Sequence, residues 1–125
     1  MTQRRLLALA VLVLAVGLAE RDARAQQPDL RTFLVGKWHQ GNPPYVTETV
    51  FTAGGVFTSI TVQRGAPYRL YVQGRWEVRY GNQLWQEWES WEPRTLRKPL
   101  PEGTPIEVID QNHIRNKLGV ATRMR

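Results

Sequence analysis

The hydrophobic and polar residues of this chain alternate over short runs, and turn residues separate the runs. The clearest run covers residues 68–80. Its even-numbered positions are apolar, except for Gly74, and its odd-numbered positions are mostly polar or charged. Unbroken alternation of this length predicts a β-strand with one buried and one solvated face. Gly74 in its middle predicts a bend or bulge, which curves a sheet towards closure.

Similar runs, rich in β-branched and aromatic residues, recur along the chain between short turns. The expected strands lie near 34–40, 45–52, 56–63, 68–80, 83–92, 105–109, 112–117 and 120–125. A helical turn at 29–34, capped by Asp29, precedes the first strand. Most neighbouring runs are linked by two to four residues. The pattern therefore predicts an all-β fold, an antiparallel meander of about eight short strands closing into a small barrel.

Residues 83–92 carry three tryptophans spaced three apart, which also fits a short helix. Two signals favour a strand instead. Gly81-Asn82 directly follows the 68–80 strand and is typical of a two-residue hairpin turn. Pro93 ends the segment early, leaving a helix too short to be stable without packing. We expect a hairpin with Gly81 and Asn82 as its loop.

That register predicts a binding pocket, because cross-strand partners project to the same face. Its expected residues are Trp76, Trp85, Glu87, Glu89 and Trp91. Inward carboxylates must be paired, solvated or protonated, so indoles with carboxylates suit a ligand that carries an amine or hydroxyls. The same register sends Trp88 outward, opposite Arg75. The alternative is a bulge near Glu87, which would exchange the faces and leave both glutamates in solvent.

The first 25 residues predict a cleavable signal peptide. Arg4 and Arg5 form a basic head, an apolar run follows to Ala19, and Ala23-Arg24-Ala25 predicts cleavage before Gln26. The run is shorter than the ~20 apolar residues of a spanning helix. We therefore expect residues 26–125 to be one periplasmic or secreted domain, with no membrane span in the mature chain.

The charge of the mature chain is modestly basic. The whole chain carries +6, and removing the four arginines and two acids of residues 1–25 leaves +4. A loop with Arg94, Arg97 and Lys98 is a candidate contact for an anionic envelope surface. Export and the interspersed Glu77 argue against nucleic acid as a partner.

Gly36-Lys37-Trp38 opens the first predicted strand, and this resembles the G-x-W signature of lipocalins and the wider calycin group. The resemblance implies that Trp38 plugs one end of a lipocalin-like barrel and that an arginine of the last strand, Arg123 or Arg125, packs across it. Later segments are also similar to bacterial lipocalin-like domains: Thr49-Val50-Phe51 before the 54–55 turn, and Gly74-Arg75-Trp76. The chain is shorter than lipocalins proper and lacks their T-D-Y triplet. The family implies ligand carriage.

Other chemistry has little support in the sequence. His39 and His113 are the only histidines, cysteine is absent, and neither a G-x-S-x-G elbow nor a glycine-rich phosphate loop occurs. We expect no metal, no cofactor and no enzymatic activity. The predicted function is an exported binding protein that holds a small amphiphilic or amine- or hydroxyl-bearing ligand. The alternative is an envelope interaction or structural module with a filled core and no small-molecule ligand.

Overall fold

The computed structural model describes residues 29–125 as one short helix and nine antiparallel strands, which confirms the predicted all-β barrel. The signal peptide predicted for residues 1–25 lies outside the described residues. The elements are α2 (Leu30–Leu34), β1 (Gly36–Asn42), β2 (Tyr45–Phe51), β3 (Val56–Gln63), β4 (Arg69–Arg79), β5 (Gln83–Glu92), β6 (Gly103–Pro105), β7 (Glu107–Asp110), β8 (His113–Asn116) and β9 (Gly119–Met124).

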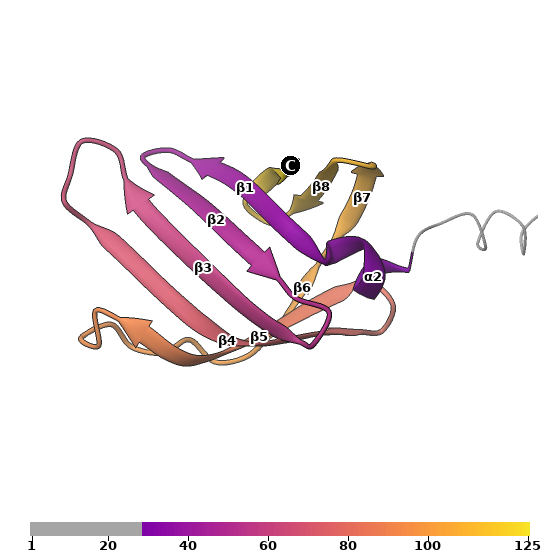
Figure 1. Ribbon diagram of the computed structural model, residues 1–125, viewed down its shortest axis with the longest axis horizontal. Helices are drawn as coiled ribbons and strands as arrows, with labels where there is room; N and C mark the ends of the chain where they lie inside the picture. Colours follow the sequence, from indigo (N-terminus) through magenta and orange to yellow (C-terminus); the bar gives the residue numbers. More distant parts are fainter. Residues whose placement is uncertain (1–28) are drawn as a thin grey trace, which may run out of the picture.

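The nine strands form one curved sheet whose two edges are consecutive in the chain (Figure 1). Their order is β6-β5-β4-β3-β2-β1-β9-β8-β7. Ile106 joins the edge strands, and its backbone N–H donates to the carbonyl of Asn82 at 2.8 Å. The strand predicted at 105–109 is thus divided into β6, which pairs with β5, and β7, which pairs with β8. The chain itself links the two edges, so the barrel is nearly closed.

Helix α2 lies against one end of the barrel, at the start of β1 (Figure 1). A helix of one turn is stable only through packing, and Leu30 and Leu34 are buried in the core. Arg31 holds the helix to the β2–β3 turn: it donates to the carbonyl of Ala53 at 2.8 Å and lies 4.1 Å from the Trp76 ring. Asp29 occupies the predicted cap position, but its carboxylate accepts from the Thr32 hydroxyl rather than from a helix N–H.

The turn between β4 and β5 contains three residues, so the predicted two-residue turn was wrong. Arg79 pairs with Gln83, and Tyr80, Gly81 and Asn82 lie between them. Tyr80 and Gly81 both have positive φ, 57° and 80°. The hairpin itself is confirmed. Its register is shifted by one residue, and this exchanges the two faces of the first half of β5.

A bulge opposite Gly74 then shifts the register back, so the last residues of β5 face the sides that the sequence predicted. Gly74 pairs with Trp88 and Gln73 pairs with Ser90, so Glu89 is the extra residue. Beyond it Val72 pairs with Trp91, which is the pairing that a two-residue loop of Gly81 and Asn82 implies. The predicted irregularity at Gly74 is confirmed, and the reason for glycine is steric, because a Cβ here would overlap the carbonyl oxygen of Glu87.

We expect Gly74→Ala to lower the free energy of unfolding by about 2 kcal/mol or more, since the added methyl group meets backbone of β5 that cannot move without breaking the pairing. Gly41→Ala is the matched control on β1, because a Cβ there has nothing within 4 Å. Its stability should be unchanged or about 0.5 kcal/mol higher. Urea unfolding of both variants measures the difference, and equal stabilities would contradict the close approach at Gly74.

Candidate ligand-binding cavity

The barrel encloses a cavity of about 400 Å³. Trp38, Phe51 and Phe57 line it towards α2, while Tyr45 and Leu118 line it at the opposite end. Tyr45 and Leu118 are 40% and 57% exposed, so this second end, the mouth, opens to solvent. Space therefore remains inside the barrel beyond the packed residues next to α2.

The lining changes from apolar to polar along five of the strands. Next to the α2 end, each of β1, β2, β3, β5 and β8 directs an apolar residue inward; this deep ring is Trp38, Phe51, Phe57, Leu84 and Ile114. Two residues closer to the mouth, the same strands direct polar residues inward; this polar belt is Gln40, Thr49, Ser59, Gln86 and Asn116. On β4 the lining residues Val72 and Leu70 are both apolar.

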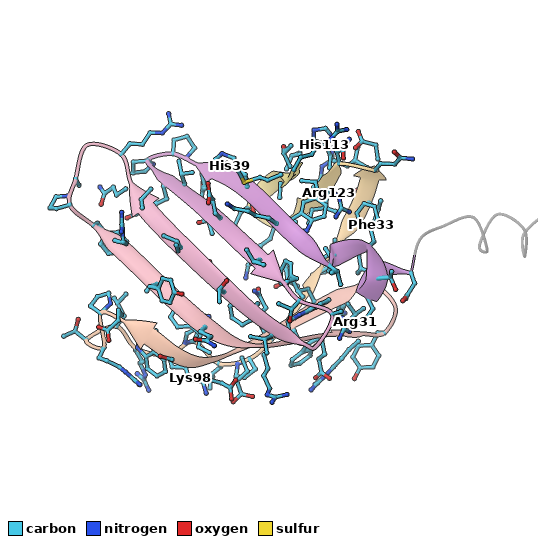
Figure 2. The ribbon with its side chains drawn as sticks, in the orientation of Figure 1. Arg31, Phe33, His39, Lys98, His113 and Arg123 are labelled. Carbon is cyan, nitrogen blue, oxygen red and sulfur yellow. The ribbon has the colours of Figure 1, made fainter. Side chains whose placement is uncertain are left out.

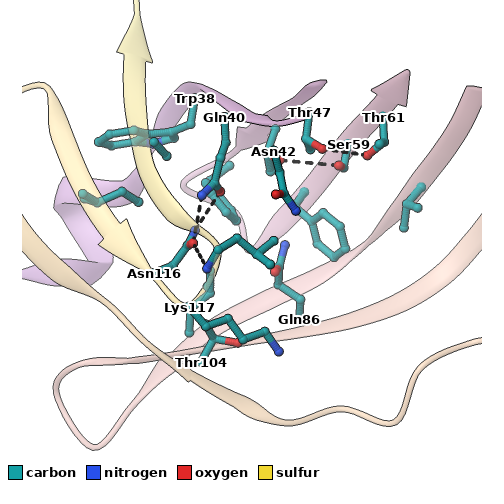
Figure 3. Close-up of a pocket in the computed structure, with 18 of the residues that line it drawn as sticks. Trp38, Gln40, Asn42, Thr47, Ser59, Thr61, Gln86, Thr104, Asn116 and Lys117 are labelled. Carbon is teal, nitrogen blue, oxygen red and sulfur yellow. Dashed lines mark hydrogen bonds between the residues drawn. The ribbon is translucent and has the colours of Figure 1, made fainter. Parts of the chain in front are cut away.

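Hydrogen bonds fix most of the polar lining (Figure 3). Gln40 and Asn116 exchange two amide hydrogen bonds, of 2.9 and 2.8 Å. Thr49 donates to Ser59 at 3.4 Å across the β2–β3 pair. One step closer to the mouth, the hydroxyls of Thr47 and Thr61 lie 2.9 Å apart. Gln86 extends into the same space and bonds to none of the residues drawn in Figure 3.

Charge is nearly absent from the cavity wall. Among residues 29–125, Lys117 is the only charged side chain that lines it. The ammonium of Lys117 lies 2.9 Å from the Glu102 carboxylate, which joins the β8–β9 turn to the loop before β6. This hydrogen bond and the positive charge of Lys117 hold the pKa of the Glu102 carboxyl below its usual range. The lining is therefore close to neutral.

The predicted Trp/Glu pocket does not form, because the three-residue turn sends both acids outward. Glu87 lies 3.1 Å from Lys98, and Glu89 lies 3.8 Å from Arg75. Their side chains are 58% and 57% exposed. The prediction that Glu87 and Glu89 point inward was wrong. Without inward carboxylates, the cavity gives no reason to expect a ligand with an amine.

The one-residue shift also places Trp85 and Trp88 on the faces opposite to those predicted. Trp85 lies on the outer face, where the Arg79 guanidinium sits 4.1 Å from its ring. Trp88 lines the cavity, and its ring centroid lies 6.2 Å from that of Trp91. The prediction that Trp88 points outward opposite Arg75 was therefore wrong, and Arg75 pairs with Glu87 instead. Trp91 donates to the Leu96 carbonyl at 2.9 Å.

Trp76, the remaining member of the predicted pocket, is buried at the α2 end and bonded to the Thr52 carbonyl. Sequence reasoning missed Gln86 and Trp88 as lining residues. The correct turn length is the signal that would have found them.

The closed end is built around Trp38, which is 3% exposed and donates to the Leu34 carbonyl at 2.9 Å. Arg123, its cross-strand partner on β9, lies 4.5 Å from the Trp38 ring and 4.7 Å from the Phe33 ring (Figure 2). Its guanidinium also donates to the carbonyls of Val35 and Phe33 at 3.1 and 2.7 Å. Of the two arginines that the resemblance offered, Arg123 therefore occupies this place.

Gly36 is part of the same arrangement. Its φ of 132° lies in the region that favours glycine, and a Cβ would come within 3.2 Å of the Arg123 guanidinium. Glycine at position 36 therefore allows the backbone at the start of β1 to lie close to the Arg123 guanidinium.

The predicted basic loop presents its charges separately. Lys98 is paired with Glu87, and the Arg94 guanidinium lies 4.5 Å from the Trp91 ring. Arg97 is exposed. No helix within residues 29–125 is long and apolar enough to cross a membrane.

The two histidines lie outside the cavity lining. The imidazole of His113 is 2.7 Å from the Asp110 carboxylate. Hydrogen bonds from the Asn112 backbone and from His113 lower the pKa of the Asp110 carboxyl. Within the described part of the chain, no three His, Asp or Glu side chains gather as a metal site.

Comparison with known proteins shows the fold alone. The chain matches no protein-family profile and no curated protein sequence. A solution structure of a protein from Bacteroides thetaiotaomicron is similar, with 10% identity and a TM-score of 0.56 over 76% of this chain and 92% of that one. The lipoprotein YedD from Klebsiella pneumoniae is similar with 14% identity and a TM-score of 0.50, over 74% of this chain and 72% of YedD. Both support a small antiparallel β-barrel, without assigning it to the lipocalin group.

We expect Trp38→Ala to destabilise the protein by about 3–5 kcal/mol, because it removes a buried indole and the surface on which Arg123 stacks. His39→Ala, the next residue on the opposite face of β1, is the control and should change the free energy of unfolding by about 0.5 kcal/mol or less. Denaturant unfolding gives both values. A loss below about 1 kcal/mol for Trp38→Ala would mean that the closed end does not depend on this side chain.

Proposed function

We propose that this chain is an exported, non-enzymatic binding protein that holds a small amphiphilic ligand in the barrel cavity. The observation that carries the proposal is the cavity itself. Its volume of about 400 Å³ falls within the ~300–1,000 Å³ of small-molecule sites. An apolar wall with a few convergent polar groups is the usual composition of such sites.

The two parts of the lining fit the two parts of an amphiphile. The deep ring forms the apolar floor of the cavity, and its residues are only 1–7% exposed. The partly exposed Leu70 and Trp88 add apolar wall above it, and covering that wall with hydrocarbon removes it from water. The polar belt offers hydroxyl and amide groups to a ligand oxygen or nitrogen. The lining hydroxyls, in the pairs Thr49–Ser59 and Thr47–Thr61, bond to one another rather than to a general base, which supports binding without reaction.

The exported location and the lipocalin-like character are part of the same proposal. Residues 1–25 have the pattern of a signal peptide. Trp38, Arg123 and Gly36 form the closed end that the lipocalin resemblance implies, and in that family such a barrel carries ligands. A lipoprotein is among the proteins of similar fold.

The test uses N-phenyl-1-naphthylamine, an uncharged fluorophore whose emission rises in apolar surroundings. We expect saturable binding to the wild-type protein. Leu70→Trp should weaken it by about tenfold or more, since the larger side chain enters the cavity from β4. Tyr71→Trp, one residue along and on the outer face, is the matched control and should bind as the wild type does.

Circular dichroism of both variants establishes that the barrel is intact. Absence of saturable binding to the wild type, or equal affinity of the two tryptophan variants, would contradict the cavity as the binding site.

A further inference from the structure

We infer that the ligand is uncharged, carries hydroxyl or carbonyl groups, and binds with its hydrocarbon part against the deep ring and its oxygen atoms at the polar belt. This inference rests on the proposed function, since it names the class of ligand for the same cavity. Charge, hydrogen-bonding capacity and the direction of the lining carry it.

Within residues 29–125 the cavity offers a ligand no unpaired counter-charge. No carboxylate of residues 29–125 lines it, and Lys117 at the mouth is already paired with Glu102. A charge moved from water into such surroundings loses its hydration without gaining a partner. An ammonium or carboxylate group therefore binds less well than an uncharged group of similar size.

The polar belt retains hydrogen-bonding capacity after its internal bonds are counted. In the Thr49–Ser59 pair, the accepting Ser59 hydroxyl keeps its own O–H. Gln40 and Asn116 each use one N–H in their mutual bonds, so each keeps a second. These groups face the cavity and are neutral. They suit alcohol, ester or amide groups, whose oxygen atoms accept such bonds. Alcohol O–H and amide N–H groups also donate to the free lone pairs of the belt.

Gln86 is the residue of the polar belt best placed to form hydrogen bonds with the ligand. It extends into the cavity from β5, apart from the bonded pairs of β1, β2, β3 and β8 (Figure 3). Its carboxamide offers both donors and an acceptor. Trp88, two residues on, lines the cavity beside it and gives the ligand an aromatic surface.

The direction of binding follows from the order of the lining. From α2 towards the mouth, the deep ring comes first and the polar belt second on each of the five strands. A chain that enters through the mouth with its hydrocarbon end leading meets apolar surface at the closed end. Its oxygen groups then stop at the belt.

Three compounds with the same ten-carbon chain test the inference: 1-decanoylglycerol, decanoate and decylammonium. Each displaces N-phenyl-1-naphthylamine from the wild-type protein, below its micellar concentration and at neutral pH. We expect 1-decanoylglycerol to bind about tenfold or more tightly than either ion. Equal affinities, or tighter binding of either ion, would overturn the inference and leave the proposed cavity site standing.

Substitution at Gln86 tests its role directly. Gln86→Glu places a carboxylate in the cavity, so decylammonium should gain at least about tenfold relative to 1-decanoylglycerol. Glu87→Gln is the matched control, because residue 87 lies on the outer face, and it should leave the preference unchanged. An unaltered preference in Gln86→Glu would overturn the contact of residue 86 with the ligand.

A second variant guards against misfolding of the first. Gln86→Leu removes the hydrogen bonds but keeps an apolar wall, so 1-decanoylglycerol should bind about fivefold to tenfold more weakly. N-phenyl-1-naphthylamine carries no hydroxyl or carbonyl group and should bind as before. Unchanged binding of 1-decanoylglycerol, or an equal loss for both compounds, would contradict a hydrogen-bonding role for Gln86. Loss of all binding by the wild type would contradict the proposed function instead.

Discussion

The three-residue turn between β4 and β5 decides which side chains of β5 enter the barrel. Successive residues of a strand face opposite sides, so one residue more or less in the turn exchanges the whole set. With Arg79 opposite Gln83, the inward residues are Leu84, Gln86 and Trp88. The bulge at Glu89 restores the other parity, and Trp91 then packs against the core. Turn and bulge together give β5 a neutral inner face.

The two ends of the barrel differ in structure: the α2 end is packed, and the opposite end holds the cavity and its mouth. Each strand contributes different residues to the two ends. At the α2 end, Trp38, Arg123 and the helix are held by stacking and by hydrogen bonds to main-chain carbonyls. These contacts satisfy the donors of Trp38 and Arg123 with main-chain carbonyls rather than with carboxylates. Beyond the deep ring most inward residues are polar, and space remains between them. The packed end therefore closes the barrel, and the cavity lies between it and the mouth.

Local patterns predicted the parts of this architecture that local physics determines. Alternation over 68–80 gave strand β4, and Gly74 marked its irregularity. The turn length could not be predicted in the same way, because it depends on Tyr80 adopting a left-handed conformation that non-glycine residues rarely take. The division of 105–109 depends on Ile106 meeting Asn82, a contact between distant segments. Correct elements with one wrong turn therefore gave a pocket lined by the wrong residues.

The outward position of the acids explains the neutrality of the interior. Glu87 and Glu89 lie on the solvent face, where they meet Lys98 and Arg75 at little desolvation cost. Had they faced inward, each would have required a cationic partner or bound water. With Gln86 between them in the sequence but on the other face, the barrel keeps a hydrogen-bonding group inside and its charges outside. Selection among ligands then rests on shape and neutral hydrogen bonds, because the one charged side chain in the described wall, Lys117, is already paired with Glu102 at the mouth.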